Sequence, residues 1–365
     1  MKNLRVALVH DWLTGMRGGE KCLEVLCELF PDAPIFTLLH IKNSTSPLIE
    51  SKKIYTSFIN YLPFVEKKYR NYLPLFPKAI EQFNFNNFDL VISTSHCVAK
   101  SIIVPKDCLH ICYCHTPMRY VWDLYDEYFG IGRANFFTRF AMNLFRPYLQ
   151  NWDVKTASRV NYFIANSINV KNKIKLYYNR EAVVINPPVD TDLFTLSKQM
   201  GKYFLIVSAL VPYKRVDIAI KCFNKTGEKL IIVGKGPNEN ELKKIAKSNI
   251  EFIGWASDKE LVKFYQNAKA LIFPGEEDFG IVPLEAMACG KPVIAFAKGG
   301  ALETVIDKKT GIFFKNQIAS DLEIAINKFK KIKFSPIVIR NNALKFSRNY
   351  YAKKMNLFLS KKIKF

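Results

Sequence analysis

Two glutamates eight positions apart mark the segment of this sequence best suited to bind hydroxyl groups and a phosphate together. Glu277 lies in a loop predicted to precede a helix, and Glu285 lies about one turn inside that helix. The loop amides at 279–282 are expected to point outward at the helix N-terminus, where free N–H groups and the helix dipole favour an anion. One short segment therefore offers donors to a phosphate and two carboxylates that accept hydrogen bonds from hydroxyl groups.

A pair of cations follows another predicted strand. The strand that ends at Leu210 leads into Lys214 and Arg215, at the mouth of a strand-to-helix turn. Two cations at such a turn can neutralise a diphosphate without a metal. The next predicted strand ends in Gly234-Lys-Gly236-Pro237, a tight turn expected over the same edge of the sheet.

A glycine pair opens the first predicted helix. The first strand ends at His10-Asp11, and Gly18 and Gly19 precede the amphipathic run Lys21–Phe30. Free amides at such a helix start favour a phosphate or a hydroxyl-rich ligand, although the glycines could also simply make a turn. The spacing of glycines 15, 18 and 19 differs from the dinucleotide-binding pattern G-x-G-x-x-G, and no acidic residue near position 40 closes a following strand.

The segment His110-Ile-Cys-Tyr-Cys-His115 is the one cluster with metal-type side chains. Its candidate ligands alternate along a predicted strand, and no second Cys/His pair stands at the spacing of a structural zinc site. We therefore expect no metal. The eight cysteines, scattered through apolar runs, are typical of small core residues in a reducing compartment.

A repeated strand–helix rhythm must position these residues. Buried strands are predicted at Leu4–His10, Leu90–Ser95, Leu109–His115, Tyr162–Asn166, Val183–Asn186, Leu205–Leu210, Leu230–Val233, Ile250–Gly254, Leu271–Pro274, Val293–Phe296 and Gly311–Phe314. Helix-length amphipathic stretches separate them, which indicates parallel α/β sheets with ligands at the carboxyl ends of the strands.

The rhythm halts near 186–190 and resumes after 197–202, as expected for two domains in a chain of 365 residues. We predict a first domain over 1–190 and a second over 200–345. A C-terminal helix of about 346–365 is expected to pack back onto the first domain.

The amino-acid composition indicates which classes of partner the chain could bind. Lys and Arg number 54 against 32 Asp and Glu, a formal charge of +22, which favours a polyanionic partner such as nucleic acid, an anionic membrane surface or a phosphorylated ligand. A lysine-rich composition without function gives the same excess. A hydrophobic content of 49% excludes a disordered chain.

Two stretches, Ser51–Phe83 and Tyr120–Trp152, are aromatic and basic at once. Such composition suits a surface lying on an anionic bilayer, or else a helical face packed into the first domain. Because no signal peptide or spanning run of about 18 apolar residues is found, we expect a cytoplasmic protein, with peripheral attachment to the inner membrane as the membrane interpretation.

Together these motifs resemble a known family. Glu277 and Glu285 with Phe279-Gly280 between them, followed by Ala-Met-Ala-Cys-Gly-Lys-Pro-Val, resemble the E-x7-E signature of retaining GT-B glycosyltransferases of family 4. The order of the other motifs fits, and the resemblance covers nearly the whole chain. His10-Asp11-Trp12-Leu13-Thr14 and Cys114-His115-Thr116-Pro117-Met118-Arg119-Tyr120 resemble the branch of O-antigen and exopolysaccharide mannosyltransferases.

The resemblance implies an α/β fold of the GT-B type, with two Rossmann-like doubly wound domains facing a central cleft. It implies that the first domain, 1–190, binds the acceptor and that the second, 200–345, binds the nucleotide sugar. It also implies a role for each candidate residue. Glu285 would bind the ribose hydroxyls and Glu277 the sugar hydroxyls, while the amides of Phe279, Gly280 and Ile281 would bind the donor phosphates and Lys214 the leaving diphosphate. His115 would lie near the anomeric carbon, Gly19 would line the phosphate or acceptor side, and Ser208, Arg215 and Gly236 would be among the donor-binding residues.

The chain departs from the family pattern at one place. Many relatives carry an arginine shortly before the lysine, where this chain has Ser208-Ala209-Leu210. Either Arg215 supplies the second charge or the diphosphate is held less tightly.

The resemblance implies a metal-independent hexosyltransferase without a cofactor, moving mannose from GDP-mannose to a lipid-linked or polysaccharide acceptor in cell-surface glycan synthesis. A UDP- or ADP-sugar is the alternative donor. A polyanion or nucleic-acid binder without enzymatic activity is a further alternative. Against it, the sequence holds no nucleic-acid motif, and its aromatic residues lie in apolar runs rather than forming a stacking platform.

Overall fold

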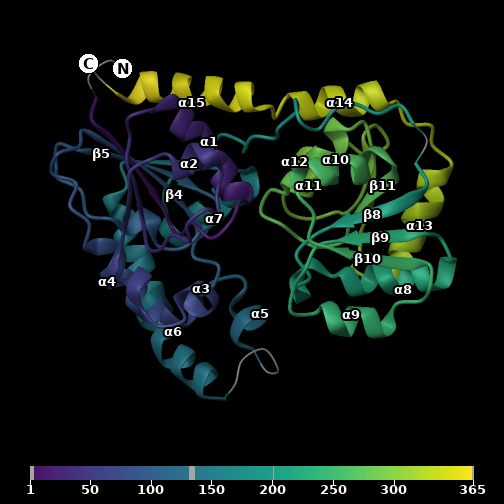
Figure 1. Ribbon diagram of the computed structural model, residues 1–365, viewed down its shortest axis with the longest axis horizontal. Helices are drawn as coiled ribbons and strands as arrows, with labels where there is room; N and C mark the ends of the chain where they lie inside the picture. The colour runs from purple at the N-terminus through teal and green to yellow at the C-terminus, as the bar shows by residue number, and fades with distance from the viewer. Residues whose placement is uncertain (1–3, 131–135, 200, 364–365) are drawn as a thin grey trace. The chain divides into compact units, whose positions relative to one another are not determined.

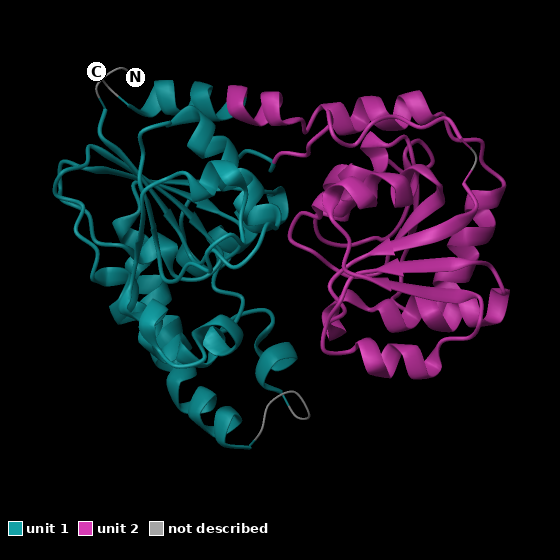
Figure 2. Cartoon of the chain, in the orientation of Figure 1, with its two compact units in different colours: residues 1–187, 354–365 teal, residues 188–353 magenta. Residues whose placement is uncertain are grey.

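The chain folds into two compact units, 1–187 with 354–365, and 188–353 (Figure 2). The computed structural model describes residues 4–130, 136–199 and 201–363. Residues 131–135 of the second aromatic and basic stretch and residues 364–365 of the predicted C-terminal helix therefore lie outside the described part.

The first unit is built on a seven-stranded sheet in which every neighbouring pair of strands is parallel (Figure 1). The strand order is β3-β2-β1-β4-β5-β6-β7. The strands are β1 (Val6–His10), β2 (Ile35–Thr37), β3 (Ile54–Thr56), β4 (Leu90–Ser95), β5 (Leu109–Cys114), β6 (Tyr162–Ala165) and β7 (Ala182–Val184).

The second unit repeats this arrangement with six parallel strands in the order β10-β9-β8-β11-β12-β13. The strands are β8 (Tyr203–Val207), β9 (Leu230–Val233), β10 (Ile250–Gly254), β11 (Ala268–Phe273), β12 (Val293–Phe296) and β13 (Gly311–Phe314). Along β8, Tyr203 and Leu205 enter one core cluster and Phe204 and Ile206 the other, because successive side chains point to opposite faces. Both faces of the sheet are therefore buried.

Helices connect the strands of both sheets. In the first unit they are α1 (Gly18–Leu29), α2 (Pro47–Glu50), α3 (Val65–Lys68), α4 (Phe76–Glu81), α5 (Tyr125–Phe129), α6 (Phe136–Thr156) and α7 (Ile168–Tyr178), with 3₁₀ turns η1 (Phe58–Tyr61), η2 (Tyr69–Leu75), η3 (Ala99–Ser101) and η4 (Ala157–Arg159). In the second they are η5 (Pro212–Lys214), α8 (Val216–Thr226), α9 (Glu239–Ile245), α10 (Asp258–Gln266), α11 (Ile281–Ala288), α12 (Ala301–Thr304), α13 (Ala319–Lys330) and α14 (Pro336–Leu344).

The last helix, α15 (Arg348–Lys362), begins in the second unit and ends in the first. Within the first unit its Phe358 ring meets Tyr162 of β6 edge-on, with ring centroids 6.4 Å apart. The ammonium of Lys362 lies 4.4 Å from the centre of the same tyrosine ring. The end of α15 therefore packs against Tyr162 on the sheet.

Local sequence explains many helix ends. The Ser257 hydroxyl accepts from the Glu260 amide, and the Glu260 carboxylate accepts from the Ser257 amide at 2.7 Å, a capping box that starts α10. Ser335 caps α14 ahead of Pro336, where proline is favoured because its missing N–H has no acceptor anyway. Helix α8 ends at Gly227, whose φ of 70° suits glycine.

The predicted α/β class with two doubly wound parallel sheets is confirmed. Strands β2 and β3 were not predicted, because three residues each are too few to produce a recognisable pattern. The predicted strand ending at Leu210 was too long, since β8 ends at Val207 and Ser208 lies in the loop. All eight cysteines are buried and free of disulfides.

The two aromatic and basic stretches differ in exposure. Much of the first is packed into the unit, with Tyr69 and Phe76 buried against Trp12. In the second stretch, α6 packs one face on the unit through Met142 and Leu149, whereas the aromatic side chains of its N-terminal part are exposed. The packed interpretation therefore holds for one face of this helix and not for those aromatic side chains. Within the described residues, no helix has both the length and the apolarity needed to cross a membrane.

Candidate active site

The candidate residues lie where each sheet reverses its strand order. In both sheets the chain moves outward from the central pair, β1 and β4 in the first and β8 and β11 in the second. Loops after such a pair leave in opposite directions, which opens space for a ligand beyond the carboxyl ends of the strands. His10 ends β1, and the loops that carry Lys214 and Glu277 follow β8 and β11.

Asp11 ties the loop after β4 to the end of β1. Its fully buried carboxylate accepts four backbone N–H bonds of 2.6–2.9 Å from residues 96–99. It also lies 3.0 Å from Nδ1 of His96. Burial favours the neutral acid, but His96 and the amide bonds outweigh burial and lower the pKa of Asp11. The carboxylate therefore stays ionised and holds this loop in place.

Gly19, in the first turn of α1, lies between two imidazoles. A Cβ on Gly19 would stand 3.3 Å from Cε1 of His10 and 3.5 Å from Nε2 of His115. A methyl group here would press on His10, so glycine allows this close approach, and the structure brings Gly19 and His115 together.

The His115 ring carries a buried nitrogen, Nε2, without a hydrogen-bond partner among the described residues. The residue is only 9% exposed. Burial, together with His96 and His10, lowers the pKa of His115 well below its usual value. The ring is therefore neutral near pH 7, and its Nε2 lies 3.5 Å from the position that a Cβ on Gly19 would take in the first turn of α1.

Glu20 is a residue of this site that the sequence reasoning missed. It is 4% exposed, accepts from the Arg17 amide at 3.0 Å, and lies 3.7 Å from Nε2 of His10. Burial raises the pKa of Glu20, but contact with His10 outweighs it and the pKa is lowered overall. Its position one residue after the glycine pair, in the first turn of a helix, was the available signal.

The sequence HICYCH does not gather its polar side chains at one point. His110 Nε2 lies 2.8 Å from the Ser93 hydroxyl and its Nδ1 lies 3.3 Å from the Arg159 carbonyl. His115 instead faces Gly19. Across residues 4–130, 136–199 and 201–363, no group of three or more His, Cys, Asp or Glu side chains is arranged to hold a metal ion.

In the second unit, Lys214 forms an ion pair with Glu277. Lys214 ends η5 after β8, and Glu277 lies in the loop after β11. A Cβ at Gly275 would lie 2.9 Å from Cα of Lys214, so the glycine allows these two loops to approach. The structure thus joins a lysine and a carboxylate that are far apart in the sequence.

The loop between Glu277 and α11 is fixed by backbone contacts. The Gly300 amide donates to the Glu277 carbonyl at 2.8 Å, and the Phe279 side chain is buried against Phe346. Gly280 precedes α11 with a φ of 86°, and Ile281 is the first helical residue. Of the predicted phosphate-binding amides, that of Ile281 therefore lies in the first turn of α11, where N–H groups lack intrahelical acceptors, and those of Phe279 and Gly280 lie just before it.

Glu285 has a partner that the sequence did not predict. Its carboxylate is 5% exposed and accepts a 2.8 Å hydrogen bond from the phenol of Tyr265 on α10. Burial, with the nearby carboxylate, raises the pKa of Tyr265 well above its usual value, so the phenol remains a donor. Tyr265 thereby orients the second glutamate of the motif.

The turn after β9 packs on the turn after β8. A Cβ at Gly236 would lie 2.3 Å from the Leu210 carbonyl oxygen, and the Ser208 amide donates to the Val233 carbonyl at 3.0 Å. Ser208 and Gly236 therefore belong to adjoining loops at the same edge of the sheet.

Arg215 lies next to Lys214 but has a different partner. Its Nε lies 3.2 Å from the Asp217 carboxylate. Asp217 therefore offsets part of the Arg215 charge, and Lys214 is the cation paired with Glu277.

Comparison with known proteins identifies the family of the chain. The model of glycosyl transferases group 1 matches residues 191–348, and the model of glycosyltransferase family 4 matches residues 18–193. An uncharacterized glycosyltransferase of Methanocaldococcus jannaschii is 30% identical over 186 residues, which cover 50% of this chain and 53% of that protein. The alpha-1,3/1,6-mannosyltransferase ALG2 of Dictyostelium discoideum is 29% identical over 245 residues, covering 57% and 56%. The matched segments thus span about half of these relatives.

Among solved structures, HepE of Anabaena in complex with UDP is similar over 98% of this chain and 100% of that one, with a TM-score of 0.71 and 17% identity. This similarity concerns the fold. Because the two family models together match residues 18–348, and the fold and the E-x7-E segment agree with them, the chain belongs to the group 1, family 4 glycosyltransferases of the GT-B fold.

Proposed function

We propose that this protein transfers a hexose, mannose from GDP-mannose, to a lipid-linked or polysaccharide acceptor at the cytoplasmic face of the inner membrane. The transfer retains the anomeric configuration, requires no metal, and serves cell-surface glycan synthesis. The observation that carries the proposal is the Lys214–Glu277 ion pair beside the N-terminus of α11.

The chemistry of these groups suits departure of a nucleoside diphosphate. As the bond to the sugar breaks, negative charge builds on the diphosphate. A lysine and helix-terminal amides already in place stabilise that charge without reorganising. In this proposal Lys214 and the amides of Phe279, Gly280 and Ile281 bind the diphosphate.

The two carboxylates bind hydroxyl groups. Glu285, held by Tyr265, accepts from the ribose, and Glu277, held by Lys214, accepts from the transferred sugar. In the first unit, the neutral His115 ring and the open first turn of α1 bind sugar or phosphate oxygens. We assign none of these carboxylates as a nucleophile.

The donor sugar is the finer part of the proposal. The mannosyltransferase ALG2 among the relatives favours mannose, whereas the UDP bound in the structure of HepE favours a UDP-sugar as the second candidate. In this proposal the choice of donor base depends on loops such as 234–238 and 254–257, so binding of each nucleotide sugar has to be measured.

A thermal-shift panel of GDP-, UDP- and ADP-sugars tests the proposal, because a ligand that binds only the folded state raises the melting temperature. We expect GDP-mannose to give the largest shift and Glu285→Gln to reduce it. A larger shift with a UDP-sugar than with GDP-mannose would make the UDP-sugar the proposed donor. No shift with any nucleotide sugar, together with salt-sensitive binding to generic DNA, would overturn the enzymatic proposal.

A further inference from the structure

Helix α6 carries a stripe of large apolar side chains exposed to solvent. Exposure is 81% for Phe137, 66% for Phe140, 69% for Leu144 and 54% for Tyr148. Aromatic and apolar side chains rarely gather in the open on one helix unless they contact a partner. We call these four residues the α6 stripe.

Helical geometry places the stripe opposite the face that packs on the unit. At 100° per residue, positions 137, 144 and 148 lie within about 40° of one another, and position 140 lies beside them. The buried residues of the same helix, Met142 and Leu149, lie on the other side. Lys155, eighteen residues after Phe137, returns to the line of the stripe because eighteen residues make five full turns.

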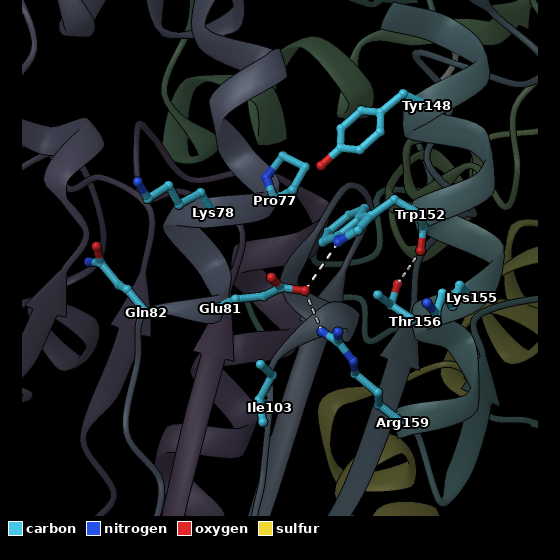
Figure 3. A pocket seen from close by; sticks show the side chains of 10 residues that line it. All are labelled: Pro77, Lys78, Glu81, Gln82, Ile103, Tyr148, Trp152, Lys155, Thr156 and Arg159. Atoms are coloured by element: carbon cyan, nitrogen blue, oxygen red, sulfur yellow. Dashed lines mark hydrogen bonds and ion pairs between the residues drawn. The ribbon is translucent and has the colours of Figure 1, made fainter.

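The stripe leads into a pocket between α4 and α6. The pocket has a volume of about 600 Å³, and Tyr148 belongs to both features (Figure 3). Figure 3 shows the rings of Tyr148 and Trp152 on the α6 side and residues of α4 opposite. The lining residues are Pro77, Lys78, Glu81, Gln82, Ile103, Tyr148, Trp152, Lys155, Thr156 and Arg159.

The charge of this pocket is positive. Its lining holds three cations and one carboxylate, and Glu81 is already engaged, at 2.6 Å from Arg159 and 3.1 Å from the Trp152 indole nitrogen. Lys78 and Lys155 are exposed and form no ion pair with any described residue. These two ammonium groups remain to attract an anion.

A buried ion pair anchors the C-terminal end of α6, the helix that carries the stripe. Lys100 and Asp153 form a fully buried ion pair at 3.0 Å, and the Asp153 carboxylate also accepts from Trp122 and Tyr178 at 2.8 Å. Because separating a buried ion pair leaves an uncompensated charge, this pair fixes the C-terminal end of α6 to the unit.

We propose that the first unit docks on an anionic phospholipid bilayer. The α6 stripe enters the boundary between headgroups and acyl chains, and lipid phosphates bind at the pocket that carries Lys78 and Lys155. A second copy of the chain is disfavoured as the occupant, because each copy has a net charge of +22 and would repel the other. The inference rests on this surface and does not depend on which sugar is transferred.

Vesicle flotation with the full chain tests the docking. One set of vesicles is phosphatidylcholine alone, and the other contains about one part phosphatidylglycerol to three parts phosphatidylcholine. We expect binding to the anionic vesicles only, weakened by added salt. Phe137→Ser with Leu144→Ser should weaken it by at least about tenfold, since each side chain loses its burial in lipid.

Charge variants test the pocket. Lys78→Gln with Lys155→Gln should lower affinity for anionic vesicles by roughly tenfold or more, because each cation near the surface contributes. The matched controls are Lys106→Gln with Lys361→Gln, exposed lysines of the same unit outside the pocket, and Leu176→Ser, an exposed leucine on α7. Circular dichroism and melting temperature confirm that each variant is folded.

Three outcomes overturn the proposal. The first is equal binding to neutral and anionic vesicles. The second is no binding to either. The third is a concentration-dependent dimer that dissociates in the Phe137→Ser, Leu144→Ser variant, which would make the stripe an interface between copies. A protein that binds vesicles but transfers no sugar would refute the proposed function and leave the docking intact.

Discussion

The phenol of Tyr265 donates a 2.8 Å hydrogen bond to the carboxylate of Glu285, and both side chains are buried. A carboxylate in this environment depends on each of its donors, because water cannot replace one that is lost. The bond joins α10 to the helix that follows the proposed diphosphate site. It therefore links the stability of the second unit to donor binding.

Tyr265→Phe should lower both the stability of the second unit and the affinity for the donor nucleotide. Removing the donor leaves the Glu285 carboxylate with one fewer hydrogen bond, which should lower the free energy of unfolding by about 1.5–3 kcal/mol. The carboxylate also loses its orientation, so nucleotide affinity should fall. Urea denaturation and isothermal titration with the donor nucleotide measure the two effects.

Tyr203→Phe is the control for this change. Its phenol donates to the neutral backbone carbonyl of Phe264 at 3.0 Å, away from the candidate site. Tyr203→Phe should lower the free energy of unfolding by only about 1 kcal/mol and leave nucleotide binding unchanged. Equal nucleotide affinity in wild type and Tyr265→Phe would contradict the positioning role.

Lys214→Ala should reduce the rate of transfer by about 10²–10³-fold, because a preorganised cation is removed from the leaving diphosphate. Steady-state kinetics with saturating donor measures the change in kcat. Lys298→Ala is a close control, since Lys298 pairs with Glu276, the residue next to Glu277, and is 62% exposed. That exposed pair should change kcat by less than about threefold. Similar losses in both variants would argue against a specific role for Lys214.

Gly19→Ala should impair turnover without unfolding the chain. The new methyl group would lie 3.3 Å from His10 and 3.5 Å from Nε2 of His115, where a substrate oxygen is proposed to bind. Displacing the substrate from that nitrogen should lower turnover on the order of 10²-fold. Glu28→Ala, at an exposed position of the same helix, should have no effect. Normal turnover in Gly19→Ala would remove His115 and α1 from the site.

Stability should fall as the pH drops below about 6.5. Burial lowers the pKa of His110 to about 3, whereas the unfolded chain takes up this proton near pH 6.5. Between these values the unfolded state binds more protons, so protonation favours unfolding. One such histidine contributes a slope of about 1.4 kcal/mol per pH unit.

The measurement compares wild type with His110→Gln by urea denaturation between about pH 6 and pH 5, where ordinary carboxylates are still mostly ionised. The wild-type slope should exceed that of the variant by about one proton. Parallel curves would show that His110 is not the group responsible. Near neutral pH, the difference in unfolding free energy between wild type and His110→Gln reports the lost packing alone.

Some of the fold and site could be read from local sequence. Buried strands such as Leu90–Ser95 and Leu230–Val233 have the predicted bounds, because a run of apolar residues between polar turns is a local signal. Strands Ile35–Thr37 and Ile54–Thr56 carried no such signal, since pairing with neighbours decides so short a strand. The aromatic residues of α6 fit a packed or an exposed face equally well from sequence, and only burial distinguished the two.

The sequence by itself determined the doubly wound α/β class and the segment from Glu277 to Glu285, because periodicity and motif spacing lie within a few tens of residues. The tertiary structure alone decided which side chains meet. Tyr265 reaches Glu285 across 20 residues, and Asp11 reaches the loop at His96 across 85. Such pairs depend on how strands and helices pack, and the burial that makes a carboxylate need its partner exists only once the chain has folded.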